Sequence, residues 1–416
     1  MKKALIFILC ALLCVQFACG TDRSVLNIMW ADSGARQEIN SCYTVLVNQE
    51  SICPNRISSM LSVLVGEDYK LCSNYINSKQ KWKDLQNKIE SDDPTLFVTK
   101  DVIELINESY LHAPDRPSYE SIMLDNCPKG KLLVLDILGK SGNIGRAFVT
   151  IEGNSFTYYR YEDTTIVEKS MCEYNLLNCE SEDEKEEILW LMPDPKTALE
   201  DSLSIALQCI HEFNIPLDLL YYEPCTIITD YINRSDGWTF VFTKQNNGLF
   251  AQIKDGQWYY INPDSPPCAG SPWGQEFCSI TVDQGGVCAF SWTGASTELK
   301  RISSSSIMLK NNTEIKPIIE KQLTEIYKDH INGKGSHLSI QVVSVNAGLS
   351  LISVDENSKI GQYVPSWYVD YRYKWSDAED IPGNWEQGQI IFNAINGNYI
   401  EPRITQDKLN RIINCT

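Results

Sequence analysis

Histidine is scarce in this sequence, and the common metal-binding and nucleophile motifs are missing from it. Its 416 residues include four histidines, and no Cys-x-x-Cys pair, HExxH, GxSxG or phosphate-binding glycine loop occurs. His211 lies inside a well-patterned helix, and His330 ends another, where a cation suits the negative end of the dipole. The sequence therefore gives no motif that would support a zinc ribbon, thioredoxin-like redox chemistry or histidine-based hydrolysis. We expect no cofactor and no bound metal, and we nominate no catalytic residue.

Positive charge is also in short supply. Lys and Arg together number 36 against 54 Asp and Glu, which gives a net charge of −18. Such a surface repels phosphate backbones and anionic lipid headgroups. The composition therefore argues against nucleic-acid binding and against a basic face that docks on a membrane.

Long apolar runs are confined to the first residues of the chain. Lys2 and Lys3 followed by the apolar stretch 4–15 predict a signal peptide over residues 1–19, too short to span a membrane comfortably. The stretch 17–20, Phe-Ala-Cys-Gly, is similar to the end of a bacterial lipobox, although Gln16 stands where Leu is usual. We expect an exported protein that is anchored to the outer face of the cell membrane by a lipid on Cys19. Ordinary cleavage after Gly20, followed by free secretion, is the alternative.

Cysteine is plentiful for an exported chain. Twelve cysteines remain when Cys10, Cys14 and Cys19 are set aside: Cys42, Cys53, Cys72, Cys127, Cys172, Cys179, Cys209, Cys225, Cys268, Cys278, Cys288 and Cys415. An even number in an exported protein favours disulfides, and Cys172 with Cys179 is the first pair that we would test. Buried free thiols, as in a protein from an anaerobe, are the alternative that the sequence leaves open.

Helices followed by strands recur along the chain. Helical periodicity marks residues 99–112, 193–216 and 313–330, and each stretch is followed by alternating, strand-like segments. Asp194 is the expected cap of the second helix, with Pro195 in its first turn. Hairpin turns are expected at Asp255-Gly256, at 284–286 and at Asn396-Gly397. We expect an α+β fold of successive amphipathic helices packed on antiparallel sheets. Its divisions are a mostly helical region over 20–93, helix-plus-sheet units over 94–180, 190–300 and 312–403, and a tail over 404–416.

The stretch 364–375, VPSWYVDYRYKW, is the most aromatic part of the chain. Its bulky residues alternate, with Trp367, Val369, Tyr371, Tyr373 and Trp375 on one face, which is the pattern of a half-buried strand. We expect this face to cover the third helix. The far end, Tyr373 and Trp375, is where an exposed aromatic contact would lie.

Because the sequence contains so many carboxylates, it does not identify an acid/base pair. Asp370 and Glu386 lie near aromatic residues, but an acidic sequence offers many such pairs, so neither is assigned a catalytic role. The acidic run at 180–187 lacks the Asp/Asn spacing and the glycine of an EF-hand loop. A solvated loop or helix start is the simpler interpretation of that run.

The C-terminal half carries a family resemblance. The stretches ITVDQGGVCAFSW, GQYVPSWYVDY and IIFNAINGNYIEP resemble a family of lipoproteins from Gram-positive gut bacteria that is defined only as a domain of unknown function. Its pattern falls on Asp283, Gly286, Phe290, Trp292, Val364, Pro365, Trp367, Asn393, Ala394 and Gly397, and the likeness covers roughly residues 190–403. Similar helix-plus-sheet endings occur in PepSY-type repeats and in membrane-tethered regulators of sensor histidine kinases. The resemblance implies an extracytoplasmic, non-catalytic module.

These observations favour a surface-anchored binding or regulatory protein of the cell envelope, not an enzyme, with another envelope protein as its partner. An exported hydrolase or glycan-binding protein that uses aromatic and carboxylate clusters is the alternative. A structural spacer would show neither partner nor ligand.

The intact mass of the mature protein tests the lipid anchor. We expect a chain that begins at Cys19 and carries the added mass of acyl chains, and Cys19→Ala should move the protein from the membrane fraction to the medium. Alkylation before the measurement, without reduction, counts the disulfides in the same spectrum. An unmodified chain that begins at Thr21 would contradict anchoring.

Overall fold

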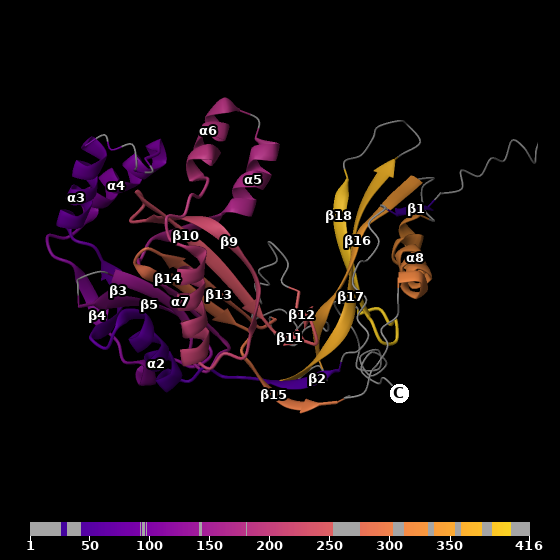
Figure 1. The fold of residues 1–416 in the computed structure, drawn as a ribbon. Helices are drawn as coiled ribbons and strands as arrows, with labels where there is room; N and C mark the ends of the chain where they lie inside the picture. The colour runs from indigo at the N-terminus through magenta and orange to yellow at the C-terminus, as the bar shows by residue number, and fades with distance from the viewer. Residues whose placement is uncertain are drawn as a thin grey trace, which may run out of the picture.

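The computed structural model describes residues 26–30, 43–91, 93, 96, 98–140, 144–179, 181–252, 275–302, 312–331, 337–353, 359–376 and 385–400 (Figure 1). Its helices are α2 (Pro54–Val65), α3 (Lys79–Glu90), α4 (Lys100–His112), α5 (Lys169–Asn178), α6 (Glu182–Leu191), α7 (Leu199–Glu212) and α8 (Asn312–Ile331), with a 3₁₀ turn at Leu124–Asn126. The strands before α7 are β1 (Leu26–Trp30), β2 (Val45–Gln49), β3 (Tyr69–Ile76), β4 (Ser118–Ser121), β5 (Leu132–Gly139), β6 (Ile144–Thr150), β7 (Ser155–Tyr159) and β8 (Thr164–Glu168). Those after it are β9 (Asp218–Thr229), β10 (Asn233–Thr243), β11 (Gln245–Asn246), β12 (Leu249–Phe250), β13 (Phe277–Asp283), β14 (Gly286–Thr293), β15 (Ser296–Arg301), β16 (His337–Ser353), β17 (Ile360–Ser376) and β18 (Glu386–Asn393).

Ten strands form the larger sheet, in the order β4-β3-β5-β6-β7-β14-β13-β10-β9-β8, and every pairing is antiparallel. Two of these pairings join strands of the predicted first unit to strands of the predicted second unit. Phe156 of β7 lies opposite Trp292 of β14, and Val167 of β8 lies opposite Thr226 of β9. Strands from the predicted first and second units, with β3 from the N-terminal region, thus share one continuous sheet.

The prediction of successive helix-plus-sheet units is wrong for this reason. Each predicted unit would leave sheet edges with unpaired backbone groups, and pairing β7 with β14 and β8 with β9 satisfies those groups. The fold is dominated by two large sheets instead of repeats, and it gives no support to a PepSY-like arrangement. The coarser expectation, helices combined with mainly antiparallel sheets, roughly fits.

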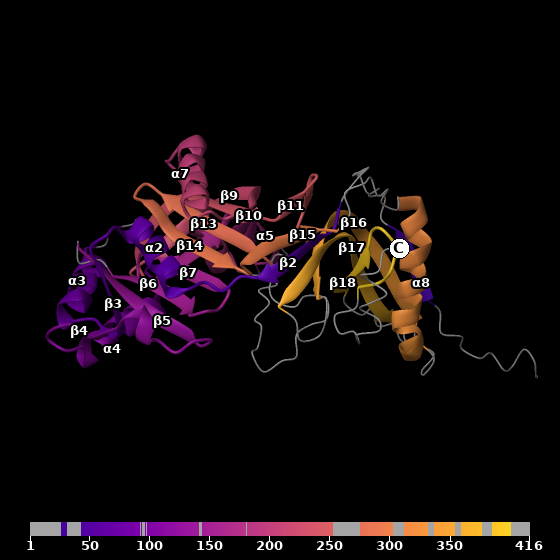
Figure 2. The ribbon, with the colours of Figure 1, turned by 90° about the horizontal axis from the view of Figure 1, so that it is seen from below.

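The smaller sheet has six strands, in the order β1-β16-β17-β2-β15, with β18 also paired to β17. Only β1 runs parallel to its neighbour, and it pairs with β16 from Leu26↔Leu338 to Trp30↔Val342. Within the smaller sheet, β2 and β15 lie on the side nearer the larger sheet in Figure 2. Short connections join β2 to α2 and β14 to β15, so the two sheets meet through these strands.

The aromatic stretch 364–375 forms the long strand β17, as its alternation predicts. Trp367, Val369 and Tyr371 are buried in one core with Ile319 and Leu323 of α8. The expected packing of this face on the third helix is therefore confirmed. Pro317, in the second turn of α8, is accommodated inside the helix.

A second core lies between the larger sheet and the helices α2 and α7. The predicted apolar stripe of α7 is confirmed: Ala206 and Ile210 are buried in this core, and Phe213 meets Phe290 edge-on with centroids 5.2 Å apart. The predicted cap is wrong, because α7 begins at Leu199 with Ala198 as N-cap, and Asp194 pairs with Lys196 instead.

Glycine turns close two predicted hairpins. Gly286 has φ +96°, a left-handed conformation that suits glycine, at the turn between β13 and β14. Gly397 has φ +79° in the turn after β18, where the Asn393 side chain accepts hydrogen bonds from the backbone of Ile395 and Asn396. The hairpin expected at Asp255-Gly256 lies outside the described residues.

The N-terminal region contains strands as well as the two expected helices. The predicted helical stretches 58–65 and 79–90 lie in α2 and α3, while β1, β2 and β3 place the same region in both sheets. None of the helices in the described parts of the chain is long and apolar enough to cross a membrane.

Substituting Leu323→Ala should destabilise the smaller-sheet core. Leu323 is fully buried, and truncating such a leucine costs about 2–5 kcal/mol of unfolding free energy. The matched control is Leu299→Ala on β15, where the side chain is 51% exposed and the expected loss is about 0.5 kcal/mol or less. Urea unfolding followed by tryptophan fluorescence measures both, and equal losses would show that α8 is not packed as described.

Candidate functional site

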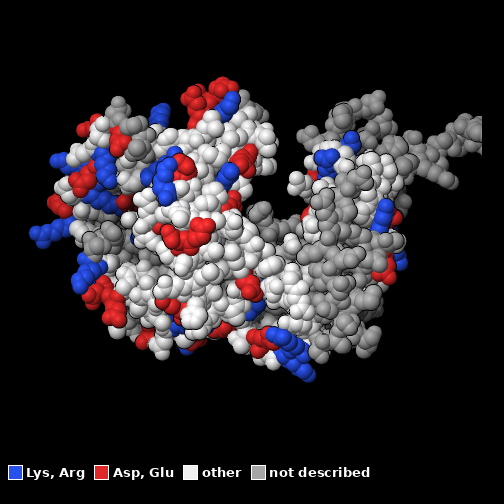
Figure 3. All heavy atoms as spheres, in the orientation of Figure 1, with Lys and Arg blue, Asp and Glu red and all other residues white. Residues whose placement is uncertain are grey.

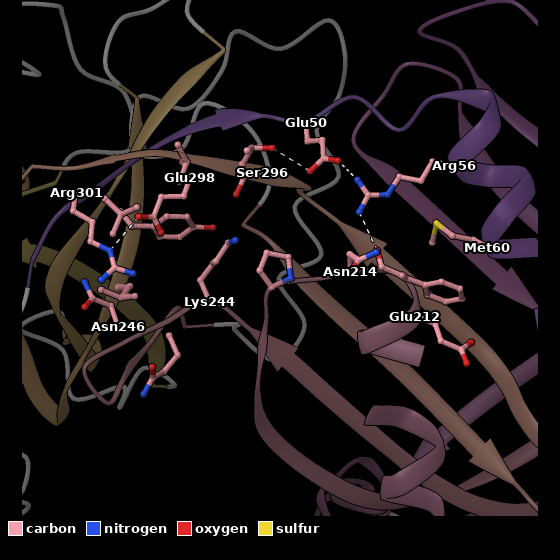
Figure 4. Close-up of a pocket in the computed structure, with 18 of the residues that line it drawn as sticks. Glu50, Arg56, Met60, Glu212, Asn214, Lys244, Asn246, Ser296, Glu298 and Arg301 are labelled. Atoms are coloured by element: carbon pink, nitrogen blue, oxygen red, sulfur yellow. Dashed lines mark hydrogen bonds and ion pairs between the residues drawn. The ribbon is translucent and has the colours of Figure 1, made fainter. Parts of the chain in front are cut away.

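A pocket lies where the two sheets meet. Its volume is about 690 Å³, and its walls come from β2, α2, the end of α7, the segment after β10, and β15 (Figure 4). Polar lining residues include Glu50, Asn55, Arg56, Ser59, Glu212, Asn214, Lys244, Gln245, Asn246, Thr297, Glu298 and Arg301. Among the described residues that line this junction pocket there is no histidine or cysteine.

Arg56 of α2 occupies one end of the pocket. Its guanidinium pairs with Glu50, donates to the carbonyl oxygen of Phe213 at 3.2 Å, and lies 4.4 Å from the centroid of the Trp292 ring. Burial lowers the pKa of Arg56, and the negative charge of Glu276 opposes that shift. Arg56 therefore connects α2 with the end of α7 and with the core of the larger sheet.

Glu276 lies beneath the pocket and has no exposed surface. One carboxylate oxygen accepts from Ser296 Oγ at 2.5 Å and faces Lys244 Nζ at 3.2 Å; the other accepts from Trp292 Nε1 at 3.2 Å. The backbone N–H of Glu276 donates to Tyr363 Oη at 3.4 Å. Burial raises the pKa of Glu276, and Lys244 and the Ser296 hydroxyl oppose this effect. These partners belong to both sheets.

Arg301 and Glu298 form the other end of the pocket. Arg301 Nε lies 3.1 Å from Glu298 Oε1, and its guanidinium lies 4.5 Å from the centroid of the Tyr43 ring. Asn246 donates from Nδ2 to the carbonyl oxygen of Tyr43 at 2.5 Å. At this end of the pocket, the salt-bridged guanidinium of Arg301 stacks on the Tyr43 ring, and the buried amide of Asn246 lies beside that residue.

A second charged cluster lies away from the pocket, where α3 meets the larger sheet. Arg146 bridges Asp136 at 3.1 Å and Glu162 at 2.5 Å, while Lys81 of α3 lies 3.2 Å from Asp230. Burial is the main cause that raises the pKa of Glu162, followed by the charge of Asp163. No described group of three or more histidine, cysteine, aspartate or glutamate side chains has a geometry that could hold a metal. The cluster joins α3 to the sheet.

The first disulfide candidates are not joined in this structure. Cys172 and Cys179 are free thiols that hydrogen-bond different carbonyl groups, of Leu191 and Leu176. Cys172 lies within α5 and Cys179 caps it, so about two helical turns, or roughly 10 Å, separate them. A disulfide needs Cα atoms within about 7 Å. The helix therefore does not favour this pairing.

Tyr373 and Trp375 lie beside α8, where both are partly buried. Tyr327 of α8 contacts both rings, at centroid distances of 5.4 and 6.3 Å. Tyr373 Oη also donates to Glu386 at 2.5 Å. Asp370 accepts from Ser344 at 2.7 Å and from Gln389 at 2.8 Å, and its pairing position lies three residues along the β17–β18 pair from that of Glu386. The two carboxylates thus have different hydrogen-bond partners, and the rings serve mainly as packing. Cys19 lies outside the described residues.

The residues that carry the family resemblance have structural roles in the cores and turns. Phe290, Trp292 and Trp367 are buried in the two cores, and Asp283 receives Arg160 Nη1 at 2.9 Å. Asn393 caps the turn that follows β18. Trp292 touches the surroundings of the pocket through Arg56 and Glu276, and Phe290 contacts Phe213, which lines it.

Sequence reasoning missed the junction pocket altogether. Glu50, Arg56, Lys244, Glu276 and Arg301 are spread over the chain and belong to no spaced motif. Each resembles an ordinary surface charge when only its neighbours in sequence are considered. We find no local signal that could have identified them.

Comparisons with known proteins add a distant likeness. No protein-family model matches the chain, and no curated protein matches it. Among solved structures, it is similar to an uncharacterized protein from Eubacterium rectale ATCC 33656, with 11% sequence identity and a TM-score of 0.39 over 90% of each chain. A likeness at this level assigns no function.

Replacing Glu276 with Gln should change how stability depends on pH. Because burial raises the pKa of Glu276 in the folded state, its favourable contribution is present below the pKa of an unfolded glutamate and is lost as the pH rises through the folded pKa. The unfolding free energy of wild type minus that of Glu276→Gln should therefore fall as the pH rises above about 4. Urea unfolding at several pH values measures this difference. A difference that is independent of pH would contradict the raised pKa.

Proposed function

We propose that this protein is an exported, non-catalytic binding protein of the cell envelope, held on the outer face of the membrane by a lipid on Cys19, and that it binds its ligand in the junction pocket. The observation that carries the proposal is the pocket itself. It has about 690 Å³, within the range of roughly 300–1,000 Å³ that is typical of ligand sites, and residues of both sheets line it.

The charges around the pocket favour binding over catalysis. Its three cations are compensated: Arg56 by Glu50, Lys244 by Glu276, and Arg301 by Glu298. A general base or nucleophile must reach the reacting atoms with a suitable pKa. The carboxylate with the raised pKa, Glu276, is instead sealed behind the wall by its own partners.

The lining suits a short peptide or a comparable zwitterionic molecule. Asn55, Asn214 and Gln245 carry amides that both donate and accept, as peptide groups do. An arginine–glutamate pair lies toward each end of the pocket in Figure 4, so a carboxylate and an ammonium can each meet an opposite charge. The Tyr43 ring already has Arg301 stacked on it, which leaves less aromatic surface for a sugar.

The proposed anchor would orient the molecule. Six residues separate Cys19 from Leu26, and an extended chain spans at most about 3.6 Å per residue, so lipid on Cys19 would hold β1 within about 25 Å of the bilayer. β1 is fixed to the smaller sheet by its pairing with β16 and by the 2.9 Å hydrogen bond from Trp30 Nε1 to Glu320. The larger sheet and the pocket would then lie farther from the membrane.

A variant that fills the pocket tests the proposed site. Ser59 is exposed on α2 and lines the pocket, so Ser59→Trp should fill it with an indole, whereas Val63→Trp, one turn along α2, should not. We expect tripeptides to raise the melting temperature of wild type and Val63→Trp but not of Ser59→Trp. Free ligand at 100 times its Kd adds about 2.7 kcal/mol of stability.

Three results would overturn parts of this proposal. If no tripeptide stabilises wild type, the ligand class is wrong. A glycan-array signal that Ser59→Trp abolishes would favour the glycan-binding alternative at the same pocket. Cleavage of peptides or glycans, detected by mass spectrometry and lost in Ser59→Trp, would favour an exported hydrolase.

A further inference from the structure

Two short helices, α5 and α6, form a hairpin that stands away from the larger sheet (Figure 1). Met171, Tyr174 and Leu177 recur every third residue on α5, so they lie along one side of the helix. Their exposed fractions are 56%, 67% and 85%, and Leu189 of α6 is 52% exposed. No other helix in the described part of the chain places three such large apolar side chains above half exposure.

The root of this hairpin is fixed firmly to the sheet. The Arg234 guanidinium donates to the carbonyl oxygens of Trp190 and Met192, the latter at 2.9 Å, and lies 4.8 Å from the centroid of the Trp190 ring. Thr226 Oγ1 donates to the carbonyl oxygen of Leu191 at 2.8 Å. Cys172, a residue of α5, is buried. The apolar side is therefore presented in a defined orientation.

The exposed faces of the two hairpin helices gain little stability from packing against the rest of the protein. Both helices have ten residues, and none of the residues of α6 is fully buried. Helices of this length are marginal by themselves, and most of their stability comes from packing an apolar face. The exposed face of α5 lacks that packing in the chain as described.

The neighbouring helix α6 carries a net negative charge, although Lys185 lies among its carboxylates. Glu182, Asp183 and Glu184 occupy the first turn of α6, and Glu186 and Glu187 follow in the next. Acidic atoms cover the tip of the hairpin in Figure 3, while uncharged surface covers the side of α5 that faces the smaller sheet. An apolar stripe beside an acidic helix is complementary to a helix with an apolar face and basic flanks.

We propose that the α5–α6 hairpin is a docking surface for a basic amphipathic helix of a partner protein. The partner helix lies along Met171, Tyr174 and Leu177, and its lysines or arginines face the carboxylates of α6. A second copy of this chain fits less well, because hairpin-to-hairpin contact would bring two acidic runs together. The surface is separate from the junction pocket and does not depend on the ligand proposed for it.

The surface suits a weak and salt-sensitive interaction. Three or four apolar side chains give a contact smaller than a standard stable interface. The charges on α6 are solvent-exposed, so salt screens their attraction within about 8 Å at physiological ionic strength. Such an interface suits a regulatory contact that forms and breaks.

The test uses the mature full-length chain and a synthetic 18-residue peptide of lysine and leucine whose leucines form one helical face. A peptide of the same composition, with its leucines spread around the helix, is the control. Microscale thermophoresis should show binding of the first peptide that weakens as salt rises. Leu177→Ser should weaken it about tenfold, through loss of one buried leucine contact. Leu111→Ser, at a 70% exposed leucine of α4, should leave it unchanged.

Circular dichroism checks that both variants remain folded. Equal binding of the two peptides, or equal effects of Leu177→Ser and Leu111→Ser, would show that bulk negative charge attracts the peptide and would overturn the proposal. A dimer in light scattering that Leu177→Ser dissolves would also overturn it, in favour of a second copy as the occupant.

Discussion

The buried carboxylate of Glu276 holds the two sheets of this protein in one arrangement. A buried carboxyl group is costly unless hydrogen-bond partners surround it, and removing one partner leaves that cost uncompensated. Its donors come from β14, β15 and the segment after β10, and Tyr363 of β17 meets its backbone. The ends of four segments must therefore converge on one point.

The junction pocket follows from that convergence. Lys244 and Ser296, which satisfy Glu276, also line the pocket, so the same contacts that join the sheets define its floor. Arg56 adds α2 to the arrangement through Trp292 and Phe213. Contacts from several segments surround this pocket, whereas the α5–α6 hairpin is attached to the sheet near its root. The molecule thus combines an internal site with a projecting surface.

The cysteines illustrate why their number did not identify a disulfide framework. All nine described cysteines are free, and several are buried in separate places: Cys278 in the larger-sheet core, Cys288 on its other side. Burial raises the pKa of these two thiols well above the usual range, which suppresses the reactive thiolate. In these positions cysteine behaves as a small apolar residue. An even number of cysteines therefore does not distinguish buried free thiols from disulfides.

The sequence by itself determined the local features: the apolar stripe of α7, the alternation of β17, and the glycine turns at Gly286 and Gly397. Each depends on residues within a few positions of one another, which the periodicity of helices and strands makes visible. Only the tertiary structure decided that β7 pairs with β14, β8 with β9 and β1 with β16, and hence that two large sheets replace three repeats. Backbone hydrogen bonds join any strand edge to another, so the sequence pattern does not name the partner. The same holds for the pocket, because the groups around Glu276 come from distant segments and only the completed fold removes them from water.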